Sequence, residues 1–150
     1  MYDYVLIAHA WWRWVVLLAG IVAICTAARG WSQGLPWAGS VSYCGKMFGV
    51  AVDVQFLMGA SLYLVFSPMT NVALNVAEGL PAGSELLFFG VYHGLIMTVA
   101  FIDVHVSAVI VRRGRSDAAK HRRSIVLYGQ TLLIIIVTTP WWRPLFPTHH

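Results

Sequence analysis

Three ionisable side chains interrupt the most apolar stretch of the sequence, Leu86 to Arg115. They are His93, Asp103 and His105, and the run that holds them, Leu86 to Val111, is long enough to cross the roughly 30 Å hydrocarbon core of a bilayer as a helix. An ionisable group at that depth is costly unless it is paired, bound to a ligand or hydrated. Each of the three is therefore a candidate functional residue.

These side chains point in different directions around the predicted helix. At about 100° per residue, His93 shares a face with Met97 and Val104, whereas Asp103 and His105 lie on nearly opposite sides. One neighbour cannot contact all of them. The spacing therefore predicts a central helix that faces several neighbours in a small bundle.

A second pair of candidates lies in the first apolar run, Val5 to Ala27. His9 and Arg13 are one helical turn apart, and their stripe continues to the small residue Gly20. Small residues in membrane helices allow close approach of a neighbouring helix. We therefore expect this stripe to face protein rather than lipid.

His9 and His93 are predicted at similar depth, because both helices enter from the same side of the membrane. Two neutral imidazoles from separate helices can fill both axial positions of a b-type haem, and an arginine can pair with a propionate. The sequence thus predicts a haem site of His9, Arg13, His93 and Met97, with the iron bound by the two histidines. The alternative is that both histidines are hydrogen-bonded interfacial residues and that Met97 fills the core.

The other polar residues of the apolar runs are predicted to lie nearer the opposite membrane face. A carboxylate beside an imidazole can hold a proton, as a quinone site requires, or it can simply hold two helices together. Both interpretations remain open for this group. Its members, predicted as one network, are Asp53, Gln55, Asp103, His105 and Gln130.

Composition indicates a membrane protein. Hydrophobic residues make up 59% and charged residues 11% of the chain, and the mean hydropathy is +0.71, far from the roughly 25% charge of a soluble domain. The net charge of +4 therefore does not indicate nucleic-acid binding. The chain is predicted to be one all-α domain, residues 1–150, folded as a four-helix transmembrane bundle with helices at about 5–27, 47–66, 86–111 and 124–139.

Basic residues predict the orientation of this bundle. The segment 112–123 contains six Lys or Arg, and residues 29–46 contain two more. Both segments are predicted as loops, and the positive-inside rule places them in the cytoplasm. Both termini are then outside a bacterial inner membrane, and His121 in the basic segment is expected to be exposed to solvent.

Several short motifs extend over nearly the whole chain. They are His9-x3-Arg13-Trp14, Gln55 followed by Gly59 and Tyr63, His93 with Met97, Lys120-His121-Arg122-Arg123 and Pro140-Trp141. This pattern resembles the small four-span bacterial membrane proteins labelled cytochrome b-like. The resemblance implies a four-helix membrane bundle that holds haem or works beside a redox complex. One departure is Tyr92, which stands where those proteins have an acidic residue.

The sequence therefore predicts an electron-transfer protein that holds a non-covalent b haem, with a quinone as a further candidate partner. The alternative is a haem-free accessory subunit of a larger respiratory or photosynthetic complex, in contact with other membrane subunits or with further copies of itself. A small proton or metal transporter is a third interpretation. No catalytic motif such as GxSxG or HExxH is present, so no enzymatic activity is assigned.

Overall fold

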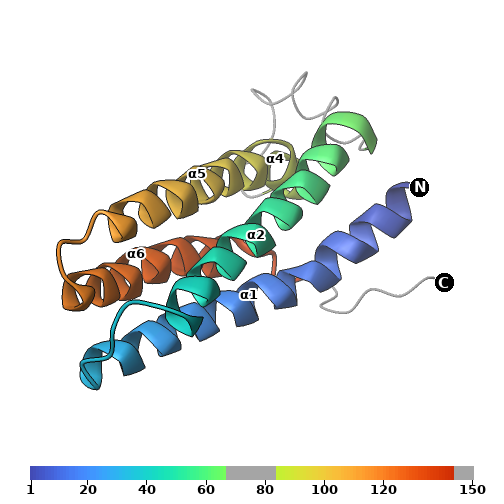
Figure 1. The fold of residues 1–150 in the computed structure, drawn as a ribbon. Helices are drawn as coiled ribbons and strands as arrows, with labels where there is room; N and C mark the ends of the chain where they lie inside the picture. Colours follow the sequence, from blue (N-terminus) through green and yellow to red (C-terminus); the bar gives the residue numbers. More distant parts are fainter. Residues whose placement is uncertain (67–83, 144–150) are drawn as a thin grey trace.

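The computed structural model describes residues 1–66 and 84–143, and this part of the chain is helical without any strand. In the described residues, four long helices lie side by side (Figure 1). They are α1 (Tyr2–Ser32), α2 (Ser40–Ser61), α5 (His93–Arg112) and α6 (Asp117–Thr138). A π-helical turn, η1 (Leu62–Phe66), extends α2, and a short helix α4 (Glu85–Leu87) with the π-helical turn η3 (Phe88–Tyr92) precedes α5.

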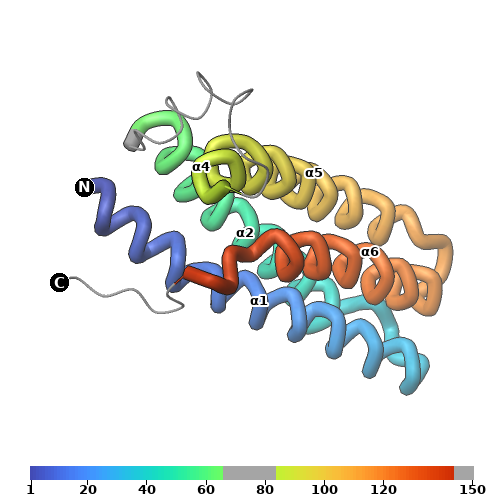
Figure 2. Tube along the Cα trace, turned by 180° about the vertical axis from the view of Figure 1, so that it is seen from behind, coloured from blue at the N-terminus to red at the C-terminus, as the bar shows by residue number. Residues whose placement is uncertain are grey.

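The four long helices form a closed ring of antiparallel neighbours. Helix α1 packs against α2 and α6, and α5 packs against the same two helices from the other side. Figures 1 and 2 show this order from opposite directions. Helices α1 and α5 run parallel, as predicted, but they lie on a diagonal of the bundle. Each of them therefore packs mainly against α2 and α6 rather than against the other.

Three helical segments are long and apolar enough to cross a membrane: Tyr2–Ser32, Ser40–Val65 and Glu85–Arg112. Helix α6 is not among them because its first two turns contain Asp117, Lys120 and two arginines, which lower the hydropathy of the segment. The structure therefore supports a multi-pass membrane protein with three clear candidate spans.

The first two helices are longer than predicted. Most of the segment 29–46, expected to be a loop, is helical, because α1 continues to Ser32 and α2 already begins at Ser40. The connection is a tight turn in which Gly34 and Gly39 have φ angles of 63° and 55°. Such positive values are readily accessible to glycine, so two glycines are enough to reverse the chain where a longer loop was expected.

The basic segment 112–123 is also partly helical rather than a loop. Ser116 caps α6, since its Oγ accepts a hydrogen bond of 3.1 Å from the backbone N–H of Ala119. Asp117 follows in the first turn, where a negative charge is favourable. These two residues start α6 seven positions earlier than Ser124, the predicted start, and so change which side chains face the bundle.

His121 is the residue most affected by this earlier start. It was predicted to be exposed, but only 1% of its surface is accessible. Its Nε2–H donates to the carbonyl of Leu35 at 3.0 Å, and its ring meets the Trp37 ring edge-on at a centroid distance of 5.0 Å. The ring rests on the backbone of Gly30 in α1. His121 therefore joins α6 to α1 and to the turn that follows it.

The core combines aromatic rings with glycine. Phe48 is fully buried and meets Tyr128 edge-on at 5.8 Å. A Cβ on Gly20 would lie 3.0 Å from Phe48 Cε2, and one on Gly45 would lie 2.9 Å from Tyr128 Cε2. Both glycines thus admit a ring that alanine would displace, and Gly20 faces protein as its stripe predicted.

We predict that Gly30→Ala destabilises the protein by about 1–3 kcal/mol, because the new methyl group would overlap the rigidly held His121 ring. Its Cβ would lie 2.8 Å from His121 Nδ1. The free energy of unfolding in mixed micelles measures the effect. Gly49→Ala is the matched control, since a Cβ there meets nothing within 4 Å. A Gly30→Ala variant as stable as this control would contradict the packing of His121.

Candidate functional site

The polar residues of the apolar helices form separate contacts between pairs of helices. Gln55 contacts α1, Asp53 contacts α5, and Asp103 contacts α6. The five residues predicted as one network are therefore divided among three interfaces. Asp53 and Gln55 lie on opposite sides of α2, because two residues span about 200° of a helix.

The first contact joins α1 and α2 through His9 and Gln55. The side-chain amide nitrogen of Gln55 lies 3.1 Å from the backbone carbonyl oxygen of His9 and 3.2 Å from His9 Nε2. A carbonyl oxygen can only accept, so this nitrogen is the donor and His9 Nε2 accepts its second hydrogen. The neutral His9 ring then carries its proton on Nδ1. This buried nitrogen and Gln55 Oε1 have no hydrogen-bond partner.

The His9 ring meets α2 edge-on at Gly59. A Cβ added to Gly59 would be 3.1 Å from His9 Cε1 and 3.6 Å from Nδ1. The edge of the ring that carries both nitrogens is therefore turned toward α2. Gly59 provides the space that this contact requires.

His93 is hydrogen-bonded to a different helix, α6. Its Nδ1–H donates to the carbonyl oxygen of Thr138, at the end of α6, at 3.3 Å. The rings of Phe88 and Phe89 lie 5.5 and 6.0 Å from the His93 ring. Both belong to the π-helical turn η3, in which the Gly90 carbonyl accepts a hydrogen bond of 2.5 Å from the Tyr63 hydroxyl.

This geometry does not fit a haem held between His9 and His93. An axial histidine presents an unprotonated nitrogen to the iron. On His93 that nitrogen is Nε2, because Nδ1 donates to Thr138. On His9 the unprotonated nitrogen is Nε2, which already accepts from Gln55 of α2. His9 is therefore oriented as a contact between helices.

The other two residues of the predicted haem site belong to packing contacts. The Arg13 guanidinium carbon lies 5.5 Å from the Trp14 ring centroid and 6.0 Å from the Trp141 ring centroid. The two indole rings are themselves 6.3 Å apart. Arg13 thus contributes to the interface between α1 and the end of α6. Met97 packs against the hydrophobic core.

Asp103 connects α5 to α6. Its Oδ1 accepts from Gln130 Nε2 at 2.9 Å, and its Oδ2 accepts from Thr131 Oγ1 at 2.5 Å. Thr131 is fully buried. Both carboxylate oxygens are therefore satisfied by neutral donors. The sequence did not point to Thr131, because threonine is common in membrane helices and its partner lies on another helix.

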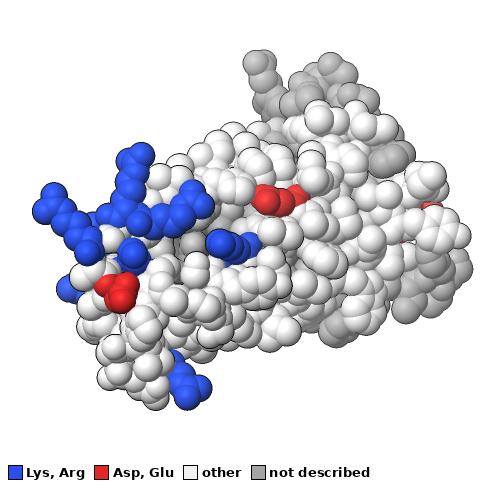
Figure 3. Space-filling model, in the orientation of Figure 1, with Lys and Arg blue, Asp and Glu red and all other residues white. Residues whose placement is uncertain are grey.

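Asp53 and His105 form the contact between α2 and α5. His105 Nε2 lies 2.9 Å from Asp53 Oδ1, and the His105 ring meets Phe101 edge-on at 4.8 Å. The side chains are 37% and 49% exposed. Figure 3 shows acidic atoms at the surface in the middle of the molecule, while most Lys and Arg side chains gather at one end. Asp53 and His105 are thus a polar pair on the outer surface of the bundle.

Within the described residues, no group of three or more His, Cys, Asp or Glu side chains is arranged to hold a metal ion. Comparison with protein-family models, with curated proteins and with solved structures gives no match for this chain. The function of this chain is therefore inferred from the contacts described above.

We predict that His9 and Gln55 are energetically coupled. In a double-mutant cycle with His9→Ala and Gln55→Ala, the coupling should be about 0.6 kcal/mol and at most about 1.7 kcal/mol, as for other hydrogen bonds between membrane helices. Unfolding free energies of the four proteins measure it. The control cycle pairs His9→Ala with Gln130→Ala, whose effects should add because the two residues have no shared contact. Equal coupling in both cycles would contradict the assignment of Gln55 to His9.

Proposed function

We propose that the chain is a haem-free, non-catalytic subunit of a larger membrane assembly, and that it crosses the bilayer four times. Three spans are the long apolar helices. The fourth is α6, whose apolar part from Ser124 to Thr138 lies against α1 and α5. With its charged first turns at the membrane surface, this part completes a bundle in which every helix has two neighbours.

The orientation is part of the proposal. Eight of the ten Lys and Arg residues occur in 29–46 or 112–123, where the four helices begin or end at the same side of the bundle. By the positive-inside rule we place this end in the cytoplasm and both termini on the outer face of a bacterial inner membrane.

The Asp53–His105 pair is the observation that carries the proposal. The Asp103–Gln130 contact is also exposed at Gln130, but in the Asp53–His105 pair both side chains are ionisable and both are more than one-third exposed. It lies well inside two membrane-spanning segments, Ser40–Val65 and Glu85–Arg112. Exposure of ionisable groups to hydrocarbon is costly, and such residues normally face protein or water. A protein partner that covers the pair removes this cost.

The surface around the pair suits a transmembrane helix. Val50 and Leu57 lie one turn to either side of Asp53 on α2 and are 48% and 66% exposed, and Val109 lies one turn beyond His105 on α5. We call these residues, together with Asp53 and His105, the α2–α5 face. It offers a helix an apolar strip with one hydrogen-bonding position at its centre. Ser, Thr, Asn or Gln on the partner helix satisfies that position.

Electron transfer through a haem or beside a quinone is the second candidate. One observation favours it: the hydrogen bond from His93 Nδ1 to Thr138 leaves Nε2 as the free nitrogen, which is the arrangement of a typical axial histidine. The His9–Gln55 contact opposes it, because it occupies the corresponding nitrogen of the other predicted ligand.

A photo-cross-linking amino acid at Leu57 should join the chain to a second protein in native membranes. Leu18 on α1 is the matched control, since the two leucines are 66% and 63% exposed and only Leu57 is on the α2–α5 face. The Asp53→Leu and His105→Leu double variant should lose the adduct but remain folded, because it removes both partners of the pair together.

Three outcomes would contradict this proposal. They are protein adducts of equal yield from both positions, an adduct that survives the double substitution, and an adduct of twice the chain mass. The last would assign the α2–α5 face to a second copy of the chain.

A further inference from the structure

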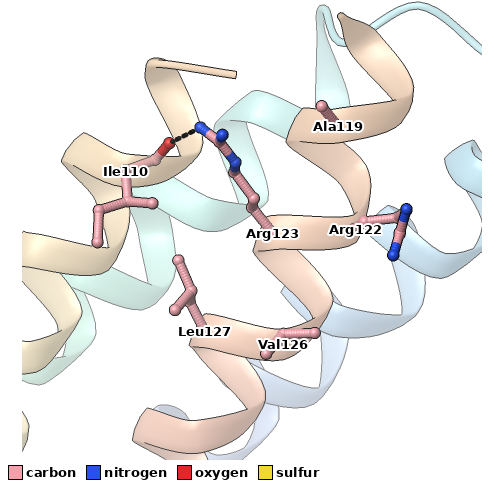
Figure 4. A pocket seen from close by; sticks show the side chains of 6 residues that line it. All are labelled: Ile110, Ala119, Arg122, Arg123, Val126 and Leu127. Carbon is pink, nitrogen blue, oxygen red and sulfur yellow. Dashed lines mark hydrogen bonds between the residues drawn. The ribbon is translucent and has the colours of Figure 1, made fainter. Parts of the chain in front are cut away.

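A groove of about 380 Å³ lies between α5 and α6 at the end of the bundle where Lys and Arg gather. Figure 4 shows its walls, which combine two arginines with small and apolar side chains. The lining residues are Ile110, Ala119, Arg122, Arg123, Val126 and Leu127. Their separation into a basic end and an apolar end suggests an amphipathic ligand.

Arg123 is held across the basic end of this groove. Its Nη1 donates a hydrogen bond of 2.9 Å to the backbone carbonyl oxygen of Ile110. Because Arg123 belongs to α6 and Ile110 to α5, this hydrogen bond holds the guanidinium beside α5. A guanidinium has five N–H donors, and the Ile110 carbonyl uses one of them. Among the described residues, the ion pairs are His105–Asp53, Lys120–Asp117 and Arg143–Glu85, so no carboxylate compensates the charge of Arg123.

Arg122 is turned the other way. In Figure 4 it points away from Ile110, and its guanidinium carbon lies 6.0 Å from the Trp31 ring of α1. Arg123 is therefore the arginine positioned to bind an anion at the groove. The surrounding charge supports an anion as well, because Asp117 is the single acidic side chain described in the segment 112–123, which contains six basic ones.

The rest of the groove is apolar and open to the outside of the bundle. Val126 is 66% exposed and Ile110 is 39% exposed, and Leu127 is packed against the core beneath them. Along α6, Val126 and Leu127 lie about one turn from Arg123, in the direction of the membrane interior. A hydrocarbon chain that follows this surface begins next to the guanidinium.

We propose that this groove binds one anionic phospholipid. The lipid phosphate accepts hydrogen bonds from the remaining Arg123 donors, and one acyl chain lies along Ile110, Val126 and Leu127. A guanidinium suits phosphate oxygens in charge and in geometry. The apolar walls select a lipid rather than free phosphate, which would leave them exposed.

Native mass spectrometry of the full-length protein in detergent tests this site. With added phosphatidylglycerol, the wild-type protein should retain one lipid in preference to phosphatidylcholine. Arg123→Gln should weaken phosphatidylglycerol binding about tenfold, because it removes a charge-assisted phosphate contact. Arg113→Gln is the matched control, since it removes the same charge from an exposed residue at the same end, outside the groove.

A second pair of variants tests the acyl-chain part without a change of charge. Val126→Trp should fill the groove and reduce retention of the lipid. Val137→Trp on the same helix should leave retention unchanged, because Val137 is 74% exposed and does not line the groove. This pair also serves if the Arg123→Gln protein does not fold.

Several results would overturn the proposal. One is an equal loss of binding in the two arginine variants, which would indicate a diffuse surface charge. Others are equal retention of the two lipids, and displacement of phosphatidylglycerol by millimolar inorganic phosphate. Lack of effect of Val126→Trp would exclude an acyl chain from the groove. These measurements use the isolated chain, so they do not depend on whether it has a protein partner.

Discussion

The constraint on which this structure depends is that a polar side chain inside a membrane must find its partner within the protein. Lipid tails are as apolar as leucine, so helices gain little by burying apolar surface against each other and associate through close packing and polar contacts. This bundle has a polar contact at each of its four helix interfaces. The contacts are His9–Gln55 for α1–α2, Asp53–His105 for α2–α5, Asp103 with Gln130 and Thr131 for α5–α6, and Arg13–Trp141 for α6–α1.

Such contacts contribute modestly to stability, typically about 0.6 kcal/mol each, but they determine which helices are neighbours. The close packing is supplied by glycines that receive a side chain from a facing helix. His9 rests on Gly59, Tyr128 on Gly45 and His121 on Gly30. At each of these positions, a side chain in place of the glycine would occupy the space that the ring fills. Polar pairing and glycine packing therefore act together along the bundle.

The sequence predicted which polar residues lie within long apolar helices, but not their partners. Helical periodicity was sufficient to show that α5 faces several neighbours. Depth does not specify the order of the helices around the bundle, and that order placed α1 and α5 on a diagonal and divided the predicted inner network. The burial of His121 could not be predicted because it depends on the helix cap at Ser116. This cap extends α6 into a segment whose charge alone predicted a loop.

The predicted haem site likewise depends on the partner of each histidine, which the sequence did not predict. His9 and His93 have the residue type and depth of axial ligands, but the direction of an imidazole nitrogen depends on the partner of the ring. Gln55 and Gly59 turn His9 toward α2. A histidine in a membrane helix is thus a ligand or a helix contact according to one neighbouring side chain. In this chain that neighbour favours the helix contact.

The most direct test is an optical spectrum of the protein purified from membranes of cells supplied with ample haem precursor. A haem-free subunit should give a dithionite-reduced spectrum without a Soret or α band in stoichiometric amount, for the wild-type protein and for the His9→Ala and His93→Ala variants alike. A stoichiometric b-type spectrum that disappears in both alanine variants would contradict it. That result would make His9 and His93 the ligands of a haem.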